Sequence, residues 1–375
     1  MRVAVIPTIR EYPWGAPGHC MGVLVEALLK GGHQVLWFVA PIDLDYPEVG
    51  RIQAAGARVV LLPPLPATYF RLRRLRASVG NLLGQAQTLE AQLAAFQPEH
   101  VFLNQGGTWC GIHAPYFEAL QPYAGRYSFI CHLNLPGPAL LGSLRERAHR
   151  LVAGAANVFF NSEWCHRLAE WQLASSIPNH RFFHYPVRFR FEAALPWPRN
   201  SIPRLAMVNR LDTHHKGIDL ALAAVAQLRE AGIKLQLSIY GSGPEEGYLR
   251  ELAKYFKVDD EVEFKGYTDR IEEVWRNEEL LLLPSRFEGL SVAMIEAMGF
   301  GRPVLRTPYG GAAEWIEDGV NGYLCPAAEV PLLCDTLQRA LAGRAGWEQM
   351  GRQAHARVKT ALQPDPARVF LENLP

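Results

Sequence analysis

Short apolar runs alternate with amphipathic segments along nearly the whole sequence. The runs are rich in β-branched and aromatic residues, as buried strands are, and the segments between them have the apolar spacing of helices. Parallel sheets that are covered by helices produce this alternation. The sequence therefore predicts an α/β fold. The expected strands are Val3–Pro7, Gln34–Val39, Arg58–Leu62, His100–Leu103, Arg126–Cys131, Asn157–Asn161, Arg204–Val208, Lys234–Tyr240, Val262–Lys265, Leu280–Leu283 and Pro303–Arg306, and the expected helices include His19–Lys30, Gly217–Ala231, Glu245–Phe256 and Val292–Gly299.

A proline-rich stretch from His184 to Pro203 interrupts this alternation and lacks helical periodicity. The chain has 375 residues, which is long enough for two domains with separate cores. We expect a first Rossmann-like domain over residues 1–185, a linker over 186–203 and a second Rossmann-like domain over 204–350. The two domains are expected to face each other across a cleft.

The overall charge excludes a general attraction to nucleic acid. The chain has 38 basic and 37 acidic side chains, so any contact with nucleic acid would need a local patch. Neither a signal peptide at the start nor an apolar run of about 18 residues is found, and we expect a cytoplasmic protein. The cysteines lie apart, without metal-binding spacing, and are expected to be reduced and structural. They are Cys20, Cys110, Cys131, Cys165, Cys325 and Cys334.

Two basic residues follow the first strand of the second half. Arg210 comes just after Arg204–Val208, with Asn209 between them, and Lys216 precedes the helix that begins near Gly217. Ligands of open α/β sheets bind at the carboxyl ends of the strands, and two cations at that edge can neutralise a diphosphate. An isolated arginine and lysine are more often solvated surface charges. The next junction repeats the plan with a glycine turn, in which Gly241 permits a ligand to approach the backbone.

The third junction of the second half, LLLLPSRFEGLSVAMIEAM, combines two glutamates with a helix start. Glu288 lies in the turn, and Ser291 is placed to cap a helix whose first amides are free to bind phosphate. Glu296 lies about one turn into that helix, within reach of a ribose diol. Considered singly, Glu288 is a turn residue and Glu296 a helix-surface acid. Together with Arg210 and Lys216 they predict a nucleotide-sugar site.

The segment from Arg204 to about Pro326 resembles the donor-binding half of glycosyltransferase family 4 (glycosyl transferases group 1), the retaining nucleotide-sugar transferases of the GT-B fold. The resemblance covers about a third of the chain and is carried by the motifs RLDTHHKG, YGSGPEE, VEFKGYTD, PSRFEGLSVAMIEAMGFGRPVL and YGGAAEWIEDGVNGYL. Two departures are Asn209, in place of a frequent glycine, and Leu290-Ser291, where many members have Phe-Gly.

The resemblance implies a role for each matching residue. The implied contacts are Arg210 and Lys216 with the donor diphosphate, Glu296 with the ribose, Glu288 and the backbone of Gly289, Leu290 and Ser291 with the donor sugar and phosphate, and the strand end from Phe264 to Gly266 with the base. The resemblance also implies that residues 351–375 cross back to the first domain, that a UDP-sugar is the most frequent donor, and that neither a metal nor another cofactor is needed.

The first half resembles the family more weakly. Gly15 and Gly18 lie in a loop that precedes a helix and can approach a phosphate or an acceptor, although a simple tight turn explains them equally well. His132 follows a strand at the place where similar proteins carry a cleft histidine that contacts the donor sugar. Without the resemblance, a structural histidine is the more common interpretation. Asp43 and Asp45 have a metal-binding spacing, but they follow an early strand in the other half, and turn chemistry explains them better.

A basic amphipathic stretch in the first half suits an anionic membrane surface. Its basic residues are Arg71, Arg73, Arg74 and Arg76. A helix that packs on its own domain is the more common meaning of such a pattern, so peripheral membrane contact is one alternative.

The predicted function is transfer of a sugar, with retention of configuration, from a nucleotide-sugar donor to an acceptor that is a glycan, a lipid or a small molecule. A nucleotide-sugar epimerase or hydrolase of the same architecture and a non-catalytic nucleotide-sugar binding protein are the alternatives. A nicotinamide dehydrogenase fits poorly, because no G-x-G-x-x-G follows the first strand.

Overall fold

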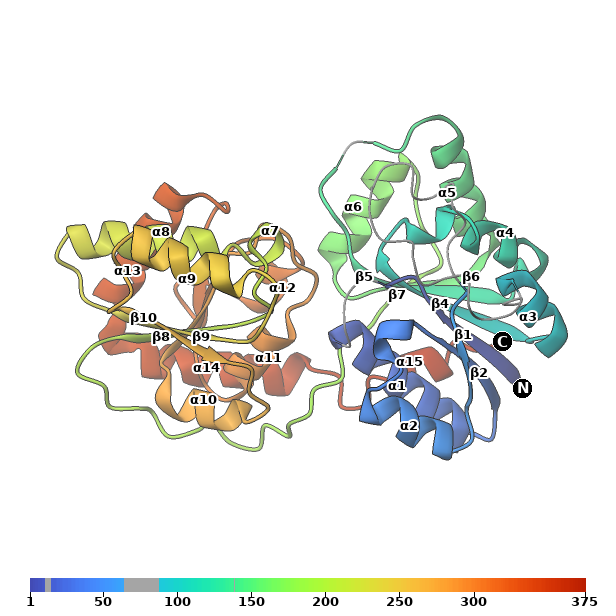
Figure 1. The fold of residues 1–375 in the computed structure, drawn as a ribbon, viewed down its shortest axis with the longest axis horizontal. Coiled ribbons are helices and arrows are strands. Elements are labelled where there is room, and N and C mark those ends of the chain that lie inside the picture. Colours follow the sequence, from blue (N-terminus) through green and yellow to red (C-terminus); the bar gives the residue numbers. More distant parts are fainter. Residues whose placement is uncertain (11–14, 64–87, 138) are drawn as a thin grey trace. The chain divides into compact units, whose positions relative to one another are not determined.

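The computed structural model describes residues 1–10, 15–63, 88–137 and 139–375, and it divides into two compact units. Unit 1 consists of Met1–Pro186 together with Gln363–Pro375, and unit 2 consists of Val187–Leu362. Each unit has a sheet of parallel strands with helices on its faces (Figure 1), which confirms the predicted α/β class. The basic stretch with Arg71, Arg73, Arg74 and Arg76 lies outside the described residues.

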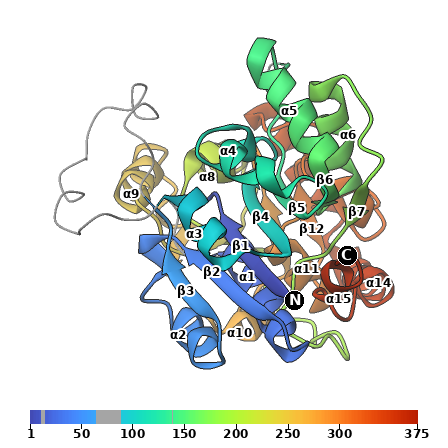
Figure 2. The ribbon, with the colours of Figure 1, turned by 90° about the vertical axis from the view of Figure 1, so that its right-hand side faces the viewer.

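The sheet of unit 1 has seven strands in the order β3-β2-β1-β4-β5-β6-β7, which can be followed in Figure 2. Its apolar core lies between this sheet and helices such as α4 and α5. The strands are β1 (Arg2–Pro7), β2 (Gln34–Val39), β3 (Arg58–Leu61), β4 (His100–Gly107), β5 (Tyr127–Leu133), β6 (Ala155–Phe160) and β7 (His180–Phe182). The helices are α1 (Ala16–Lys30), α2 (Pro47–Ala54), α3 (Leu89–Phe96), α4 (Tyr116–Leu120), α5 (Gly142–Gly154), α6 (Glu163–Leu173) and α15 (Arg368–Leu371).

The sheet of unit 2 has six strands in the order β10-β9-β8-β11-β12-β13. Leucines, valines and alanines of α8 and α13 pack against alternate residues of β8 and β9 to form its core. The strands are β8 (Arg204–Val208), β9 (Gln236–Tyr240), β10 (Val262–Gly266), β11 (Leu280–Leu283), β12 (Val304–Arg306) and β13 (Gly322–Leu324). The helices are α7 (Thr213–Lys216), α8 (Ile218–Glu230), α9 (Glu246–Tyr255), α10 (Ile271–Asn277), α11 (Val292–Gly299), α12 (Ala312–Trp315), α13 (Val330–Ala342) and α14 (Trp347–Ala361).

The proline-rich stretch that we expected to be a linker is packed on unit 2 from Val187 onward. The ring of Phe191 lies 5.2 Å from that of Phe300, at the end of α11. The buried guanidinium of Arg302 donates a hydrogen bond of 2.8 Å to the carbonyl of Pro196, so the stretch finds polar partners without regular structure. At the other end, α14 belongs to unit 2, and the chain rejoins unit 1 at Gln363 rather than at residue 351.

Within the described part of the chain, every helix is too short or too polar to cross a lipid bilayer.

Candidate functional site

Three neighbouring strands of unit 2 place the predicted residues at one edge of the sheet. β9, β8 and β11 lie side by side and parallel, so the loops that follow them share the carboxyl edge. Arg210 and Lys216 follow β8, Gly241 follows β9 and Glu288 follows β11. The ammonium nitrogen of Lys216 lies 2.7 Å from Oε2 of Glu288. This ion pair joins two junctions that are 72 residues apart in the sequence.

Lys216 is held in place by the short helix α7, which it ends. Asp212 caps this helix by accepting a hydrogen bond of 3.1 Å from the amide of His215, and Glu245 accepts one of 2.6 Å from the amide of Thr213. Gly217 then has a φ of +63°, and a β-carbon there would lie 2.2 Å from the carbonyl oxygen of Pro284. The chain after β8 is therefore fitted closely onto the chain after β11.

Arg286 fastens the same two segments, and sequence reasoning missed it. Its guanidinium forms two hydrogen bonds of 2.8 and 2.7 Å with the carboxylate of Asp219 and one of 2.7 Å with the carbonyl of Thr213. Such a two-bond contact between a guanidinium and a carboxylate fixes the relative orientation of the two side chains in addition to pairing their charges. The two partners lie 67 residues apart, and no local pattern connects them.

Glu288 is an almost buried carboxylate, with 11% of its side chain exposed. Burial acts to raise its pKa, but the charges of Lys216 and Arg306 and the hydrogen bonds from Lys216 and Ser285 outweigh burial and hold the pKa below its usual range. Glu288 is therefore ionised at neutral pH and can accept hydrogen bonds from hydroxyl groups. Arg306, which is fully buried at the end of β12, was not among the predicted site residues.

Arg210 lies at the same edge and forms an ion pair with Asp212. Its side chain is 29% exposed, so part of it can be reached from solvent. The carboxylate of Asp212 thus bonds both Arg210 and the amide of His215, the residue before Lys216.

The helix α11 begins next to Glu288. Ser291 caps it as predicted, with its hydroxyl 3.3 Å from the amide of Met294. Among the described residues, the amides of Gly289, Leu290 and Ser291 have no hydrogen-bond acceptor. Free amides at a helix N-terminus are suited to binding an anion.

Glu296 lies in the middle of α11 and is 8% exposed. Burial raises the pKa of its carboxyl to about 7, and the charge of Arg188, from the stretch that enters unit 2, opposes this rise. At neutral pH the carboxyl is thus close to half ionised, and its charge depends on what binds beside it.

At Gly241, the backbone of this chain occupies the place where we expected a ligand to approach. Gly241 has a φ of +134°, and a β-carbon there would lie 1.8 Å from the carbonyl oxygen of Asn209. Its amide donates to the carbonyl of Gly266, the last residue of β10. Phe264, two residues earlier, has the guanidinium of Arg250 4.7 Å from its ring centre. These residues shape the loops at the sheet edge beside Arg210.

His132 does not occupy an accessible position, in contrast to our expectation of a residue that contacts the donor sugar. It is 3% exposed, its Nδ1 lies 2.8 Å from the hydroxyl of Tyr185, and its Nε2 is hydrogen-bonded to Asn104. Burial lowers its pKa to about 3, so the ring is neutral. With both ring nitrogens engaged, His132 on β5 connects Asn104 on β4 with Tyr185, just before the chain enters unit 2.

The glycines of the first loop lie at the start of α1 in unit 1. Gly15 is the N-cap residue, with an extended backbone, and it is exposed. Gly18 is within the first turn of the helix, which begins three residues earlier than expected. Asp43 ends a short 3-10 turn at Pro41–Asp43, and no cluster of three or more metal-binding side chains occurs in the described ranges.

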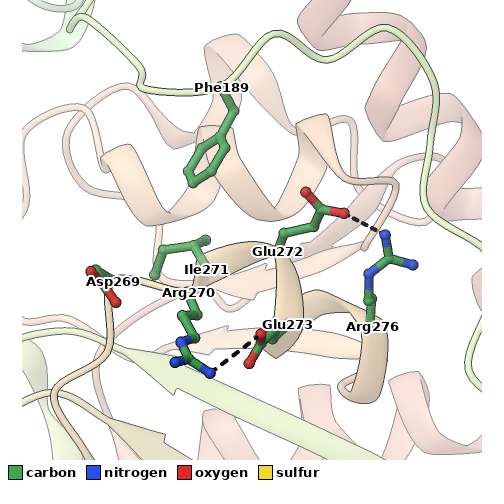
Figure 3. Close-up of a pocket in the computed structure, with 7 residues that line it drawn as sticks. All are labelled: Phe189, Asp269, Arg270, Ile271, Glu272, Glu273 and Arg276. Carbon is green, nitrogen blue, oxygen red and sulfur yellow. Dashed lines mark hydrogen bonds and ion pairs between the residues drawn. The ribbon is translucent and has the colours of Figure 1, made fainter.

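A hollow of about 340 Å³ lies elsewhere in unit 2, between Phe189 and the residues around α10 (Figure 3). Four of the charged side chains that line it form two ion pairs, Arg270 with Glu273 at 3.6 Å and Arg276 with Glu272. None of the residues predicted from the sequence lines it. Arg210, Lys216, Gly241 and Glu288 lie at the carboxyl edge of the sheet instead.

Gly310 fits the loop after β12 against the Glu288 turn. It has a φ of +62°, and a β-carbon would lie 2.0 Å from the carbonyl oxygen of Glu288. We expect Gly310→Ala to lower the free energy of unfolding by roughly 3 kcal/mol, through backbone strain and a clash with main chain. Gly319→Ala is the matched control, because its φ of +78° is similar and its β-carbon meets nothing within 4 Å. Equal losses of melting temperature in the two variants would contradict the close fit.

Comparison with known proteins agrees with the resemblance expected for the second half. Residues 202–343 match the family model for Glycosyl transferases group 1. The chain is 30% identical over 211 residues to an alpha-D-kanosaminyltransferase of Streptomyces kanamyceticus, covering 56% of this chain and 49% of the relative. It is 31% identical over 126 residues to an N-acetyl-alpha-D-glucosaminyl L-malate synthase of Bacillus anthracis, covering 34% and 33%. The chain spans less than half the length of the curated relatives it matches.

Solved structures show the same fold over the whole chain. The Anabaena protein Alr3699/HepE in complex with UDP has a TM-score of 0.71 at 18% identity, with 100% of this chain and 99% of that chain covered. A sucrose-phosphate synthase from Thermosynechococcus elongatus has a TM-score of 0.69 at 18% identity, with 100% and 98% covered. The two Rossmann-like units are thus those of the GT-B fold, which confirms the predicted fold class.

Proposed function

We propose, from the Glycosyl transferases group 1 match and the geometry of the sheet edge, that this protein is a retaining glycosyltransferase of family 4 that uses a nucleotide-sugar donor. The observation that carries the proposal is the ion pair between Lys216 and Glu288. It brings a cation suited to a diphosphate and a carboxylate suited to sugar hydroxyls to one point, beside free helix amides. A relative of the same fold was crystallised with UDP, and we infer UDP as the carrier here.

In this proposal each group binds one part of the donor. Arg210, Lys216 and the amides at the start of α11 neutralise the diphosphate, whose charge grows as the sugar leaves. The carboxylate of Glu296 accepts hydrogen bonds from the ribose hydroxyls, and that of Glu288 from the hydroxyls of the sugar. The strand end from Phe264 to Gly266 flanks the base.

The chain's own residues then stabilise the departing diphosphate, without a metal ion. No side chain at this edge is placed as a nucleophile in the proposal, so the acceptor attacks on the face that the diphosphate leaves, and a phosphate oxygen takes its proton. The configuration of the sugar is thereby retained. His132 is left out of the reacting groups, because its two nitrogens are already bonded. Gly15 and Gly18 stay candidates for contact with the donor phosphate or with a glycan, lipid or small-molecule acceptor.

The proposal is tested by a screen of nucleotides and nucleotide sugars for thermal stabilisation, followed by NMR of turnover. A ligand at 100 times its dissociation constant adds about 2.7 kcal/mol of stability. Transfer that requires an acceptor and keeps the anomeric configuration supports the proposal. Inversion at carbon 2 of the sugar, or release of the sugar to water without an acceptor, would identify an epimerase or a hydrolase instead. Binding of a nucleotide sugar without turnover over broad acceptor panels would identify a binding protein.

Affinity for UDP is expected to rise with pH, because the pKa of Glu296 is near 7. The ionised carboxylate accepts a hydroxyl hydrogen bond at each oxygen, whereas protonation turns one oxygen into a donor, so affinity should increase by up to about tenfold between pH 6 and pH 8. Calorimetric titration at both pH values measures the change. The Glu296→Gln variant corrects for the titration of UDP itself and should lose this part of the rise. An identical pH dependence in the variant would contradict a role for Glu296 at the ribose.

The cytoplasmic location and the membrane contact through Arg71, Arg73, Arg74 and Arg76 stay predictions from the sequence.

A further inference from the structure

The hollow beside α10 in unit 2 is lined by both apolar and charged side chains (Figure 3). Its volume of about 340 Å³ is at the lower end of the range for small-molecule sites. Phe189, from the stretch that enters unit 2, lies on one side of it, and side chains of α10 and of the turn before α10 lie on the other. The hollow therefore has the size to hold one small ligand.

Phe189 is packed against other aromatic rings. Its ring centre lies 5.0 Å from that of Phe300, with the ring planes at 65°, and 6.4 Å from that of Phe191. The residue is only half-buried, and its ring points into the hollow. Ile271, which is also half-buried, adds a second apolar surface. A ligand in the hollow thus meets an aromatic wall that is already in position.

The charged side chains of the hollow almost balance one another. A guanidinium nitrogen of Arg270 lies 3.6 Å from a carboxylate oxygen of Glu273, and Arg276 forms an ion pair with Glu272. With Asp269 added, the lining has two guanidinium groups and three carboxylates. Because these described residues carry no excess of positive charge, the hollow is poorly suited to a phosphate or a nucleotide. The described part of the chain also has no group of three side chains that could hold a metal ion.

An uncharged ligand with several hydroxyl groups matches this lining. The four side chains of the two ion pairs are 47% to 73% exposed, so solvent reaches them. Each hydroxyl group of a sugar both donates and accepts a hydrogen bond, which suits carboxylate acceptors that lie beside guanidinium donors. The C–H face of a sugar ring is apolar and can pack on the face of an aromatic ring.

The hollow is separate from the proposed donor site. Phe300, which packs on Phe189, follows α11 at its C-terminal end, whereas Glu288 lies before its first residue. The eight residues of α11 rise by about 12 Å. None of Arg210, Lys216 and Glu288 lines the hollow. A ligand in the hollow would therefore leave the residues of the donor site uncovered.

We propose that this hollow is a saccharide-binding site, which takes a neutral sugar residue with its apolar face on Phe189 and its hydroxyl groups on the ion pairs of α10. The binding of a sugar in the hollow is independent of the proposed transfer. Its use, which is to hold a sugar residue of an acceptor or product glycan away from the donor site, rests on the proposed function.

Saturation-transfer difference NMR with the methyl glycosides of glucose, galactose, mannose and N-acetylglucosamine tests this site without a donor. At least one glycoside should receive saturation at its ring protons. Phe189→Leu keeps an apolar side chain against Phe300 but removes the aromatic face, and it should lower the affinity for that glycoside by roughly 2- to 12-fold. A lack of transfer to all four glycosides overturns the proposal, and so does an equal affinity of the wild-type protein and Phe189→Leu.

A second variant removes polar contacts at constant net charge. Glu272→Ala with Arg276→Ala deletes one ion pair of the hollow, and Glu348→Ala with Arg352→Ala deletes a matched pair on α14, also four residues apart and half exposed. Only the first double variant should bind the glycoside more weakly, and equal binding by the two overturns the proposal. These side chains are partly exposed, so the comparison decides even if Phe189→Leu folds poorly.

Inorganic phosphate is the remaining probe. It should not displace the glycoside, and displacement would overturn the assignment of a neutral ligand. Because no nucleotide is present in these measurements, a failure of UDP binding or of sugar transfer would contradict the proposed function alone.

Discussion

Replacement of Lys216 by alanine is expected to lower kcat/KM for sugar transfer by about 10²- to 10³-fold or more, with the fold intact. The ammonium group lies 2.7 Å from Glu288, beside the free amides of α11, and in our proposal it stabilises the charge of the departing diphosphate. Alanine removes this charge at the end of the short helix α7, where the backbone is held by Asp212 and Glu245. Initial rates with the donor found in the screen measure the loss.

Lys234→Ala is the matched control for this substitution. Lys234 is an exposed lysine of the same unit, and it precedes β9 at the opposite, amino edge of the sheet. Its removal should leave the rate unchanged. Near-wild-type turnover by Lys216→Ala, with Lys234→Ala unaffected, would contradict the role of Lys216. A circular dichroism spectrum and melting temperature close to those of the wild type exclude loss by unfolding.

Replacement of Glu288 by glutamine is expected to lower kcat about 10²-fold or more while binding of UDP persists. Glutamine has nearly the same volume, but it presents one acceptor oxygen where the carboxylate presents two, and it ends the ion pair with Lys216. Since UDP lacks the transferred sugar that Glu288 is assigned to bind, its affinity should be unchanged or higher, because Lys216 is released to the diphosphate. Steady-state kinetics together with calorimetric titration of UDP separate the two effects.

Glu296→Gln, in the helix α11 that follows the Glu288 turn, is the comparison variant. Its expected effect is on UDP affinity, because Glu296 is assigned to the ribose, whereas Glu288→Gln should act on the rate. The two assignments would be contradicted by the reverse pattern, in which Glu288→Gln abolishes UDP binding and Glu296→Gln changes kcat alone.

The strands that the sequence revealed are those with a buried apolar run. β1, β2 and β8 begin and end within one residue of their expected bounds, because side chains on both faces of a covered parallel sheet are apolar. β7 and β13 were missed. Each has three residues and lies at an edge of its sheet, so neither has the length that produces a pattern.

That Lys216 and Glu288 lie at one edge of the sheet was predictable, since parallel strands bring their carboxyl ends to one edge whatever their separation in the sequence. Their ion pair was not among the expectations. Contacts that depend on side-chain packing could not be predicted from the sequence. No feature of the amino-acid sequence distinguishes the fully buried Arg306 from a surface arginine at a strand end. The burial of His132 could not be predicted from the sequence either, because its partner Tyr185 lies 53 residues away in a stretch without regular structure.

A crystal structure of the protein with bound UDP tests the central claim most directly. We predict a diphosphate within hydrogen-bond distance of Arg210, Lys216 and the amides at the start of α11, with the ribose hydroxyls on the carboxylate of Glu296. A nucleotide bound away from these four groups, for example in the hollow between Phe189 and α10, would contradict the account.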